Sequence, residues 1–187
     1  MDRILSITLF QRLLGAEFFH LAPAIKELHG RHGDFRHAGV ASVRRGRGPL
    51  KALLARIAGL PPTMEDAPIE VRFNSTADGE VWRRRFGTAA MQSRLRAGDG
   101  LLVERLGPCT FGIRLVRIGK ELAWTVERAR LFGIMQLPAT LFDGVRCRES
   151  EDEAGRYRFF VEARLPVIGL LIRYEGWLQP ADAVTAG

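Results

Sequence analysis

The repeat distance of the apolar residues changes near residue 68, and this change constrains the fold more than any other feature. Before it, apolar residues recur every three or four positions, as on one face of a helix. After it they alternate with polar residues, as on a strand whose two faces differ. Candidate strands are 69–74, 80–86, 91–96, 101–106, 110–118, 121–130, 145–150, 156–164 and 170–178. Short connections rich in Gly, Pro and Asp separate them, which favours antiparallel neighbours.

The first sixty residues are mainly helical in pattern. A first apolar stripe is formed by Phe10, Leu13, Leu14, Phe18 and Leu21. A second short helix is expected between Pro23 and Gly30, followed by a strand within 35–46. A third helix should begin at Pro49 and end before Gly59. Its apolar face is Leu50, Leu53, Leu54 and Ile57. We expect this face to pack on an apolar surface.

These elements predict an α+β fold that is mainly antiparallel β. About nine or ten sequential strands rarely stay flat, so we expect a strongly curved sheet or barrel covered by two or three N-terminal helices. One domain should span 1–180, with a helical part at 1–62 and a β-meander at 68–178. The remaining residues, 181–187, are expected to form a frayed tail.

The formal net charge of +7 is concentrated in one segment. Residues 31–60 contain seven Lys or Arg and one acid, Asp34. Such a patch would attract phosphate, an acidic partner or anionic lipid. Aromatic residues do not alternate with these cations as they do in single-strand nucleic-acid sites, so the sequence does not favour nucleic-acid binding.

The cysteines and the hydropathy indicate a cytoplasmic protein. Cys109 and Cys147 are far apart and form no CxxC motif, which favours buried reduced thiols. No apolar run approaches the roughly 18 to 20 residues that span a bilayer. The opening MDRILSITLFQRLLG lacks the pattern of a secretory signal.

The stretch EVWRRRFG, residues 80–87, contains one arginine that alternation places on the core side. Trp82, Arg84 and Phe86 share one face of this strand, and Arg83 and Arg85 share the other. A buried arginine needs an acid or several acceptors. By the same alternation, the inward polar residues of the other strands are Glu104, Arg128 and Glu149, and Trp124 lies on the face of Arg128.

Three interpretations of this inward set stay open. It can be an ion-pair network that fixes strand register. It can be the polar end of an apolar pocket, where Arg84 and Arg128 meet an anionic head, Glu104 and Glu149 orient them, and Trp82, Phe86 and Trp124 form the wall. It can also be a pair of carboxylates for acid–base catalysis, although the sequence offers no nucleophile and no catalytic residue is assigned.

Two further clusters carry weaker signals. The four histidines, His20, His29, His32 and His37, have no helical HxxxH pair, so neither a metal nor any other cofactor is expected. The segment with Arg44, Arg45, Arg47 and Gly48 precedes a helix N-terminus and is the best candidate for an exposed anion patch.

The connections 131–142 and 165–171 are unusually apolar. Loops normally carry polar residues because they run through water. Either these segments pack under the N-terminal helices, which we favour, or they form an apolar rim for a partner, a membrane surface or a ligand entrance.

Motifs along the whole chain resemble those of a bacterial family known as domain of unknown function 4166. They are FQRLLG at 10–15, LHG at 28–30, GxxxVxxGRGPLxxLLARxAGLPP from 39, WxRxFG at 82–87, SRL at 93–95, LVERxGPxxFGxRL from 102, RARLFGI at 128–134 and VEARLPVIGLLIRYEGWL at 161–178. The resemblance places Trp82, Arg84, Phe86, Ser93 and Glu104 in recurrent motifs and supplies no catalytic residue. It implies a module that occurs alone or behind a saccharopine-dehydrogenase-like NAD(P)-binding domain, which this chain lacks.

Two functions follow as expectations. The first is a non-catalytic binding module for an apolar, lipid-like molecule with an anionic head, held inside the curved sheet. The second is an accessory domain for a separate NAD(P)-dependent oxidoreductase, with a filled core and an interface made by the 31–60 patch and the apolar loops. Peripheral membrane contact is compatible with the first.

Overall fold

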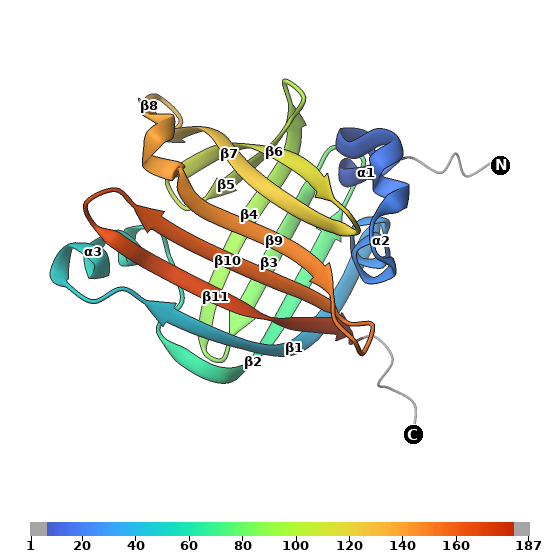
Figure 1. Ribbon diagram of the computed structural model, residues 1–187, viewed down its shortest axis with the longest axis horizontal. Coiled ribbons are helices and arrows are strands. Elements are labelled where there is room, and N and C mark those ends of the chain that lie inside the picture. The colour runs from blue at the N-terminus through green and yellow to red at the C-terminus, as the bar shows by residue number, and fades with distance from the viewer. Residues whose placement is uncertain (1–6, 182–187) are drawn as a thin grey trace.

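The strands close into an antiparallel β-barrel, seen in a computed structural model that describes residues 7–181 (Figure 1). The sheet order is β6-β5-β4-β3-β2-β1-β11-β10-β9-β7-β8, and β6 also pairs with β7. This last pairing closes a ring of ten strands and leaves β8 attached only to the end of β7. The strands are β1 (Gly33–Arg45), β2 (Met64–Ser75), β3 (Glu80–Phe86), β4 (Ala89–Gly98), β5 (Leu101–Leu106), β6 (Cys109–Ile118), β7 (Glu121–Leu131), β8 (Met135–Leu137), β9 (Gly144–Glu151), β10 (Tyr157–Leu165) and β11 (Gly169–Pro180). The expected mainly antiparallel barrel with N-terminal helices is confirmed.

The first and last strands of the sequence, β1 and β11, are neighbours in this ring. Each of β2 to β7 pairs with the strand before it in the sequence, whereas β1 pairs with β11 from His37↔Pro180 to Arg45↔Ile172. Two glycines permit this contact: a Cβ on Gly39 would lie 1.9 Å from the carbonyl oxygen of Trp177, and one on Gly176 would lie 2.2 Å from that of Val40. Because β1 and β11 are far apart in the sequence, their pairing is set by tertiary packing rather than by a turn.

Three N-terminal helices close one end of the barrel. They are α1 (Leu9–Leu14), the 3₁₀ helix η1 (Gly15–His20) and α2 (Pro23–His29), on the right of Figure 1. The first begins at a capping box, in which the Thr8 hydroxyl accepts from the Gln11 N–H and the Gln11 side chain accepts from the Thr8 N–H. Backbone N–H groups of Ala22 and Ala24 donate to the Lys120 carbonyl at 2.9 Å and to Glu151 at 2.7 Å. The helices are thus fixed to the β6–β7 turn and to β9.

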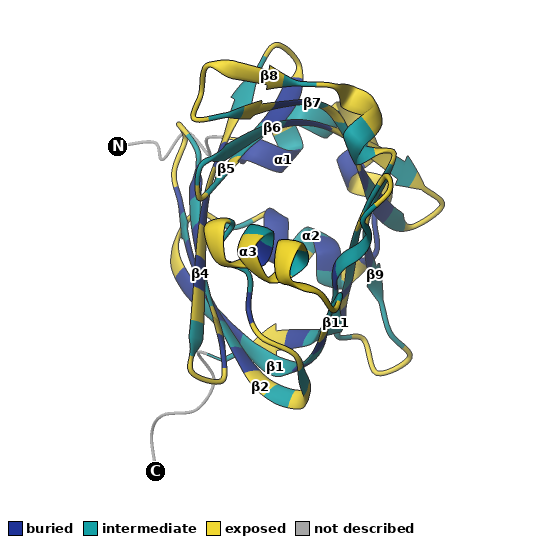
Figure 2. Cartoon of the chain, turned by 90° about the vertical axis from the view of Figure 1, so that its left-hand side faces the viewer, coloured by how far each residue is buried: buried dark blue, intermediate teal, exposed yellow. Residues whose placement is uncertain are grey.

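The helix α3 (Pro49–Ile57) lies at the opposite end, in the foreground of Figure 2, with α1 and α2 behind it. Pro49 occupies its first position, as the sequence predicts. Its expected packing is wrong in part. Leu50, Leu53 and Ile57 are 54%, 54% and 50% exposed, and only Ala55 is fully buried. Most of the apolar stripe therefore faces solvent.

The apolar connections also lie at the α3 end, so the favoured packing under the N-terminal helices is wrong. The first contains β8 and the 3₁₀ helix η2 (Ala139–Phe142), and the second is the β10–β11 turn (Figure 1). Of the expected frayed tail, 182–187 lie outside the described residues, as do 1–6 of the N-terminal segment; Ala181 still bonds to Arg36. No helix within residues 7–181 is long and apolar enough to span a bilayer.

Candidate functional site: the barrel cavity

The barrel encloses a cavity of about 630 Å³. Every barrel strand except β1 contributes lining side chains, and α3 contributes Leu54, Ile57 and Ala58. Most of these side chains are aliphatic or aromatic. A volume of this size is in the range of small-molecule sites, and a ten-stranded barrel is wide enough to leave such a space after its interior side chains are placed.

The exposure of the lining residues shows where the cavity opens. Trp82 and Trp124 are 5% and 7% exposed, although both line it. By contrast, Ile57 on α3 and Phe132 after β7 also line it and are 50% and 70% exposed. The cavity therefore reaches solvent at the α3 end and is closed by α1, η1 and α2 at the other.

Arg84 points into this cavity from β3, as alternation predicts. Its neighbours Arg83 and Arg85 are exposed, while Trp82 and Phe86 are buried. The guanidinium Nη1 donates to Ser93 Oγ on β4 at 2.9 Å, and its carbon lies 4.7 Å from the Trp82 ring centroid. Nη2 lies 3.8 Å from Glu104 Oε1, beyond hydrogen-bond distance.

The arginine is consequently charge-balanced but not saturated. Its bond to Ser93 is the only hydrogen bond of this guanidinium within the described chain. Arginine carries five N–H donors in a planar fork, so most of them remain for another acceptor. The side chain is 11% exposed and lines the cavity, so an acceptor for these donors would lie in the cavity.

Glu149 also points inward, as expected, but its partner is a histidine rather than an arginine. His29 Nε2 at the end of α2 lies 2.7 Å from Glu149 Oε2, and both side chains are buried. The His29 ring stacks on Phe10 with centroids 3.7 Å apart. The expected orientation of the arginines by Glu149 is therefore not seen, and this carboxylate fixes the helical end to β9.

Arg128 does not belong to the cavity, so its predicted inward position is wrong. A register shift in the β6–β7 pair leaves Gly112 opposite Arg128 and Ile113 opposite Val126, so that Glu127 is an extra residue. Such a bulge reverses the alternation beyond it. Arg128 is thereby placed on the outside, where Nη2 bonds to Asp99 at 2.7 Å.

Trp124 lines the cavity with an indole N–H that has no acceptor within the described residues. Its ring lies 6.0 Å from that of Trp82, centroid to centroid, and the same Trp82 ring lies 4.7 Å from the guanidinium carbon of Arg84. Buried indole N–H groups normally have a partner, and an unpaired donor costs roughly 1–3 kcal/mol. An acceptor on a bound molecule would supply that partner.

A second buried carboxylate lies beside the closed end. Glu80 accepts from Trp82 Nε1 at 2.7 Å and from Ser75 Oγ at 3.2 Å. Burial raises the pKa of Glu80 above its ordinary value, and the nearby carboxylate of Glu149 adds to the rise, while the charge of His29 and both hydrogen bonds oppose it. Its role in the geometry is to hold the Trp82 ring.

The two cysteines and two tyrosines in the wall are held in their neutral forms. Both thiols are free, and burial raises the pKa of Cys109 and, more strongly, that of Cys147, where Glu149 and Glu104 add to the effect. Burial likewise raises the pKa of Tyr157 and Tyr174. A nucleophilic cysteine needs a lowered pKa, so neither thiol is activated for attack on a substrate.

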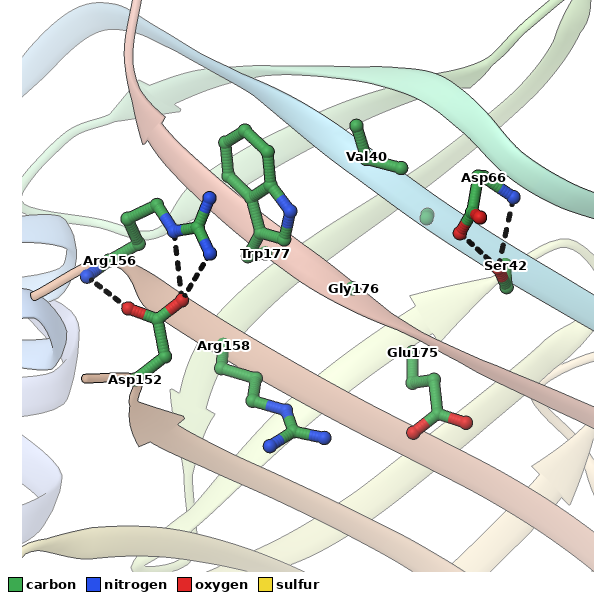
Figure 3. A pocket seen from close by; sticks show the side chains of 10 residues that line it. Val40, Ser42, Asp66, Asp152, Arg156, Arg158, Glu175, Gly176 and Trp177 are labelled. Carbon is green, nitrogen blue, oxygen red and sulfur yellow. Dashed lines mark hydrogen bonds and ion pairs between the residues drawn. The ribbon is translucent and has the colours of Figure 1, made fainter. Parts of the chain in front are cut away.

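A second hollow, of about 350 Å³, lies on the outer face of β1, β10 and β11 (Figure 3). Its polar side chains are largely engaged with one another: Arg156 pairs with Asp152 and lies 4.0 Å over the Trp177 ring, and Ser42 bonds to Asp66. Glu175 is paired with Arg173. Among the described residues, Arg173 Nε beside this hollow is the one buried polar atom of the surface without a hydrogen-bond partner.

The histidines and the expected anion patch do not belong to the cavity. His29 and His37 bond to Glu149 and Glu27, and no group of three metal-binding side chains occurs in residues 7–181. In the expected anion patch, Arg45 donates to the carbonyl oxygens of Pro61 and Leu60. Arg44, Arg47 and Gly48 are exposed at the start of α3.

Sequence reasoning missed three polar residues at the closed end: His29, Glu80 and Tyr157. Signals for two of them were present. His29 continues the helical series Ile25, Leu28, and Glu80 shares the inward face of Trp82. Ser93 had only been placed in a motif, although Met91 and Leu95 flank it on the buried face of β4.

The fold and the cavity define a closed antiparallel barrel with one plugged and one open end. The family model of the Domain of unknown function (DUF4166) matches residues 21–178. The chain therefore belongs to this family. Among curated proteins, no significant match was found.

Proposed function

We propose that the protein is a non-catalytic binding module that holds an elongated, lipid-like molecule in its barrel, with an anionic head against Arg84. The observation that carries the proposal is the cavity itself. It is apolar, opens at one end, and has in its wall a guanidinium with most of its donors unused.

The polar groups of the deep wall support a negatively charged head. A carboxylate accepts two parallel hydrogen bonds from an arginine fork, and such pairs are among the strongest in proteins. The unpaired indole N–H of Trp124 provides a further donor in the cavity wall. Glu104, at 3.8 Å from Arg84, balances the charge of the guanidinium and would move away from it when the head arrives.

The accessory-domain alternative is less well supported. It requires a filled core, whereas a volume of about 630 Å³ remains inside this barrel. An acid–base pair is also not favoured, since Glu149 is engaged by His29 and the wall offers no activated nucleophile. The expected cytoplasmic location is part of the proposal.

The head-group preference is the most direct test. Titration calorimetry would compare palmitate, hexadecanol and hexadecylammonium on the wild type, Arg84→Met and Arg83→Met. Loss of a charge-assisted pair should weaken palmitate binding about 10- to 100-fold in Arg84→Met and leave hexadecanol nearly unchanged. Arg83→Met, on the outer face of the same strand, is the matched control.

Two results would overturn the proposal. One is equal affinity for palmitate and hexadecylammonium, which would show that the site has no preference for an anionic head group. The other is no binding of any of the three by a protein that native mass spectrometry shows to be free of bound molecules. Ala163→Trp, which places a large ring in the cavity wall, should abolish binding of all three in a folded protein.

A further inference from the structure

The open end of the barrel is surrounded by exposed apolar side chains, which we call the apolar rim. Seven of the large apolar residues exposed within residues 7–181 lie here: Leu50, Leu53, Ile57, Phe132, Ile134, Met135 and Val167. The other four, Ile7, Phe19, Val116 and Ile118, belong to the segments at the plugged end. Exposed patches of this kind mark interaction sites.

Contacts between the rim segments show that they form one surface. A Cβ at Gly107 in the β5–β6 turn would lie 3.5 Å from the Ile57 carbonyl oxygen. The Phe132 N–H donates to Pro108 of that turn at 2.7 Å. On the other side, a Cβ at Gly169 would lie 4.0 Å from Lys51 Nζ of α3. The helix thus contacts the turns after β5 and β10, and the turn after β7 contacts the one after β5.

Two rim residues are held in a backbone conformation that bulky side chains rarely adopt. Phe132 has a φ of 54° and Val167 one of 64°, and each lies at the tip of a turn. Val167 is fully exposed and Phe132 is 70% exposed, so burial of these side chains in the fold does not offset the cost of the positive φ. A β-branched residue with positive φ is a clear outlier, and such strain is typical of functional surfaces.

The segments that form the rim carry an excess of positive charge. The segments 43–64, 129–142 and 163–172 contain no acid, and their cations are Arg44, Arg45, Arg47, Lys51, Arg56, Arg130 and Arg164. Among described residues only Arg164 of these is in an ion pair, with Glu162. Apolar tips beside an excess of cations match an anionic lipid surface, where the tips enter the acyl boundary and the cations meet phosphate groups.

We infer that the apolar rim docks the open end of the barrel onto an anionic lipid bilayer. The occupant is a membrane because the apolar residues encircle an entrance into an apolar cavity instead of forming a flat patch on the barrel side. A lipid-like molecule could then pass from bilayer to cavity without crossing water. The docking does not depend on which molecule the cavity holds, so its test is separate from that of the ligand.

Vesicle flotation with the full chain tests the inference. The vesicles would be phosphatidylcholine alone, or with about 30% phosphatidylglycerol, at about 50 and 500 mM NaCl. Wild type should bind the anionic vesicles at least about tenfold more tightly than the neutral ones, and salt should reduce this difference. The absence of binding to anionic vesicles overturns the inference.

Variants separate the apolar and the basic contributions. Phe132→Asn with Val167→Asn removes two apolar tips, and because asparagine accepts positive φ, the fold should keep its Tm. This double variant should lose at least about tenfold in affinity for anionic vesicles. Arg47→Gln with Lys51→Gln should lose the preference for anionic vesicles. Phe19→Ser, exposed at the plugged end, is the matched control and should bind like wild type.

Three outcomes would overturn the membrane assignment. Equal losses in Phe19→Ser and in the rim variants would show non-specific adsorption. Unchanged binding by the rim variants would place the contact elsewhere. Concentration-dependent dimers in light scattering, abolished by Phe132→Asn with Val167→Asn in a protein that does not float with vesicles, would assign the rim to a second copy. Palmitate affinity should stay at the wild-type value in Val167→Asn alone and in Arg47→Gln with Lys51→Gln, because none of these three residues lines the cavity.

Discussion

His29 Nε2 lies 2.7 Å from Glu149 Oε2, and the two residues are 120 positions apart in the sequence. One ends α2 and the other lies in β9, so their contact joins the helical plug to the barrel wall. Phe10 stacks on the same histidine ring, which adds α1 to the joint. The closed end is therefore held by a polar contact inside an aromatic cluster.

Breaking this contact from one side should destabilise the fold. Glu149→Ala leaves a buried imidazole without its acceptor and should lower the free energy of unfolding by about 3 kcal/mol. His29→Phe keeps the stacking on Phe10 but leaves a buried carboxylate, so a similar loss is expected. Urea unfolding followed by circular dichroism measures both.

The double variant His29→Phe with Glu149→Met checks the cause. If the loss arises from an unpaired polar group, the double variant should lose clearly less than the sum of the single variants. Arg114→Ala, which breaks the exposed pair with Glu127, is the control and should leave the unfolding midpoint close to that of the wild type. Additive losses would show that the two residues act separately.

Glu80 should make the protein less stable as pH rises through the acidic range. Its folded pKa is raised by burial, so the unfolded chain ionises first and the folded state holds more protons between the two pKa values. Stability falls with pH wherever the folded state binds more protons. Glu80→Gln cannot ionise, while its amide can still accept from Trp82 and donate to Ser75.

The measurement is Tm between about pH 4 and pH 7 for wild type and Glu80→Gln. The difference in Tm should be smallest at the acidic end and should grow in favour of the variant above the ordinary glutamate pKa. A constant difference across this range would show that Glu80 ionises equally in both states. Asp152→Asn, at an exposed turn where the Arg156 contacts lower the carboxyl pKa, should show the opposite trend when the series is extended below about pH 4.

Much of the barrel could be predicted because alternation is a local property of each strand. The pattern in EVWRRRF places Arg84 inward, and the structure shows the same face. Arg128 was misplaced because its bulge depends on the pairing with Gly112 in another strand. A pattern read along one strand does not include that partner.

The candidate site was harder to predict than the strands because its contacts are long-range. The helical period of α3 identified an apolar face but not what covers it, and the structure leaves most of that face in solvent. Glu149 was correctly placed inside, yet its partner lies on a helix that the alternation argument did not include. The period reports which side is apolar, whereas tertiary packing decides the neighbours.

Gly39 should not tolerate a side chain, because the backbone of β11 approaches that of β1 closely there. A Cβ would lie 1.9 Å from the Trp177 carbonyl oxygen, a backbone atom that cannot rotate away. Gly39→Ala should cost about 3 kcal/mol by forcing the closing strands apart. Gly119→Ala, at a turn with φ of 62° and nothing within 4 Å, should cost only the conformational strain of about 1–2 kcal/mol. Equal losses in urea unfolding would contradict the close approach.

The cavity thiols should react slowly with a water-soluble disulfide reagent. Burial raises the pKa of both, and for Cys147 the nearby Glu149 and Glu104 add to the rise, so little thiolate is present near neutral pH. At about pH 8, labelling of each should be at least tenfold slower than that of glutathione, and Cys147 should be slower than Cys109. The single variants Cys109→Ser and Cys147→Ser separate the two rates, and guanidinium-unfolded protein provides the unprotected reference.

The rates should continue to rise above about pH 8.5, where an ordinary thiol is already half ionised. Rapid labelling of Cys147 in the folded protein would contradict the raised pKa and the burial of this thiol.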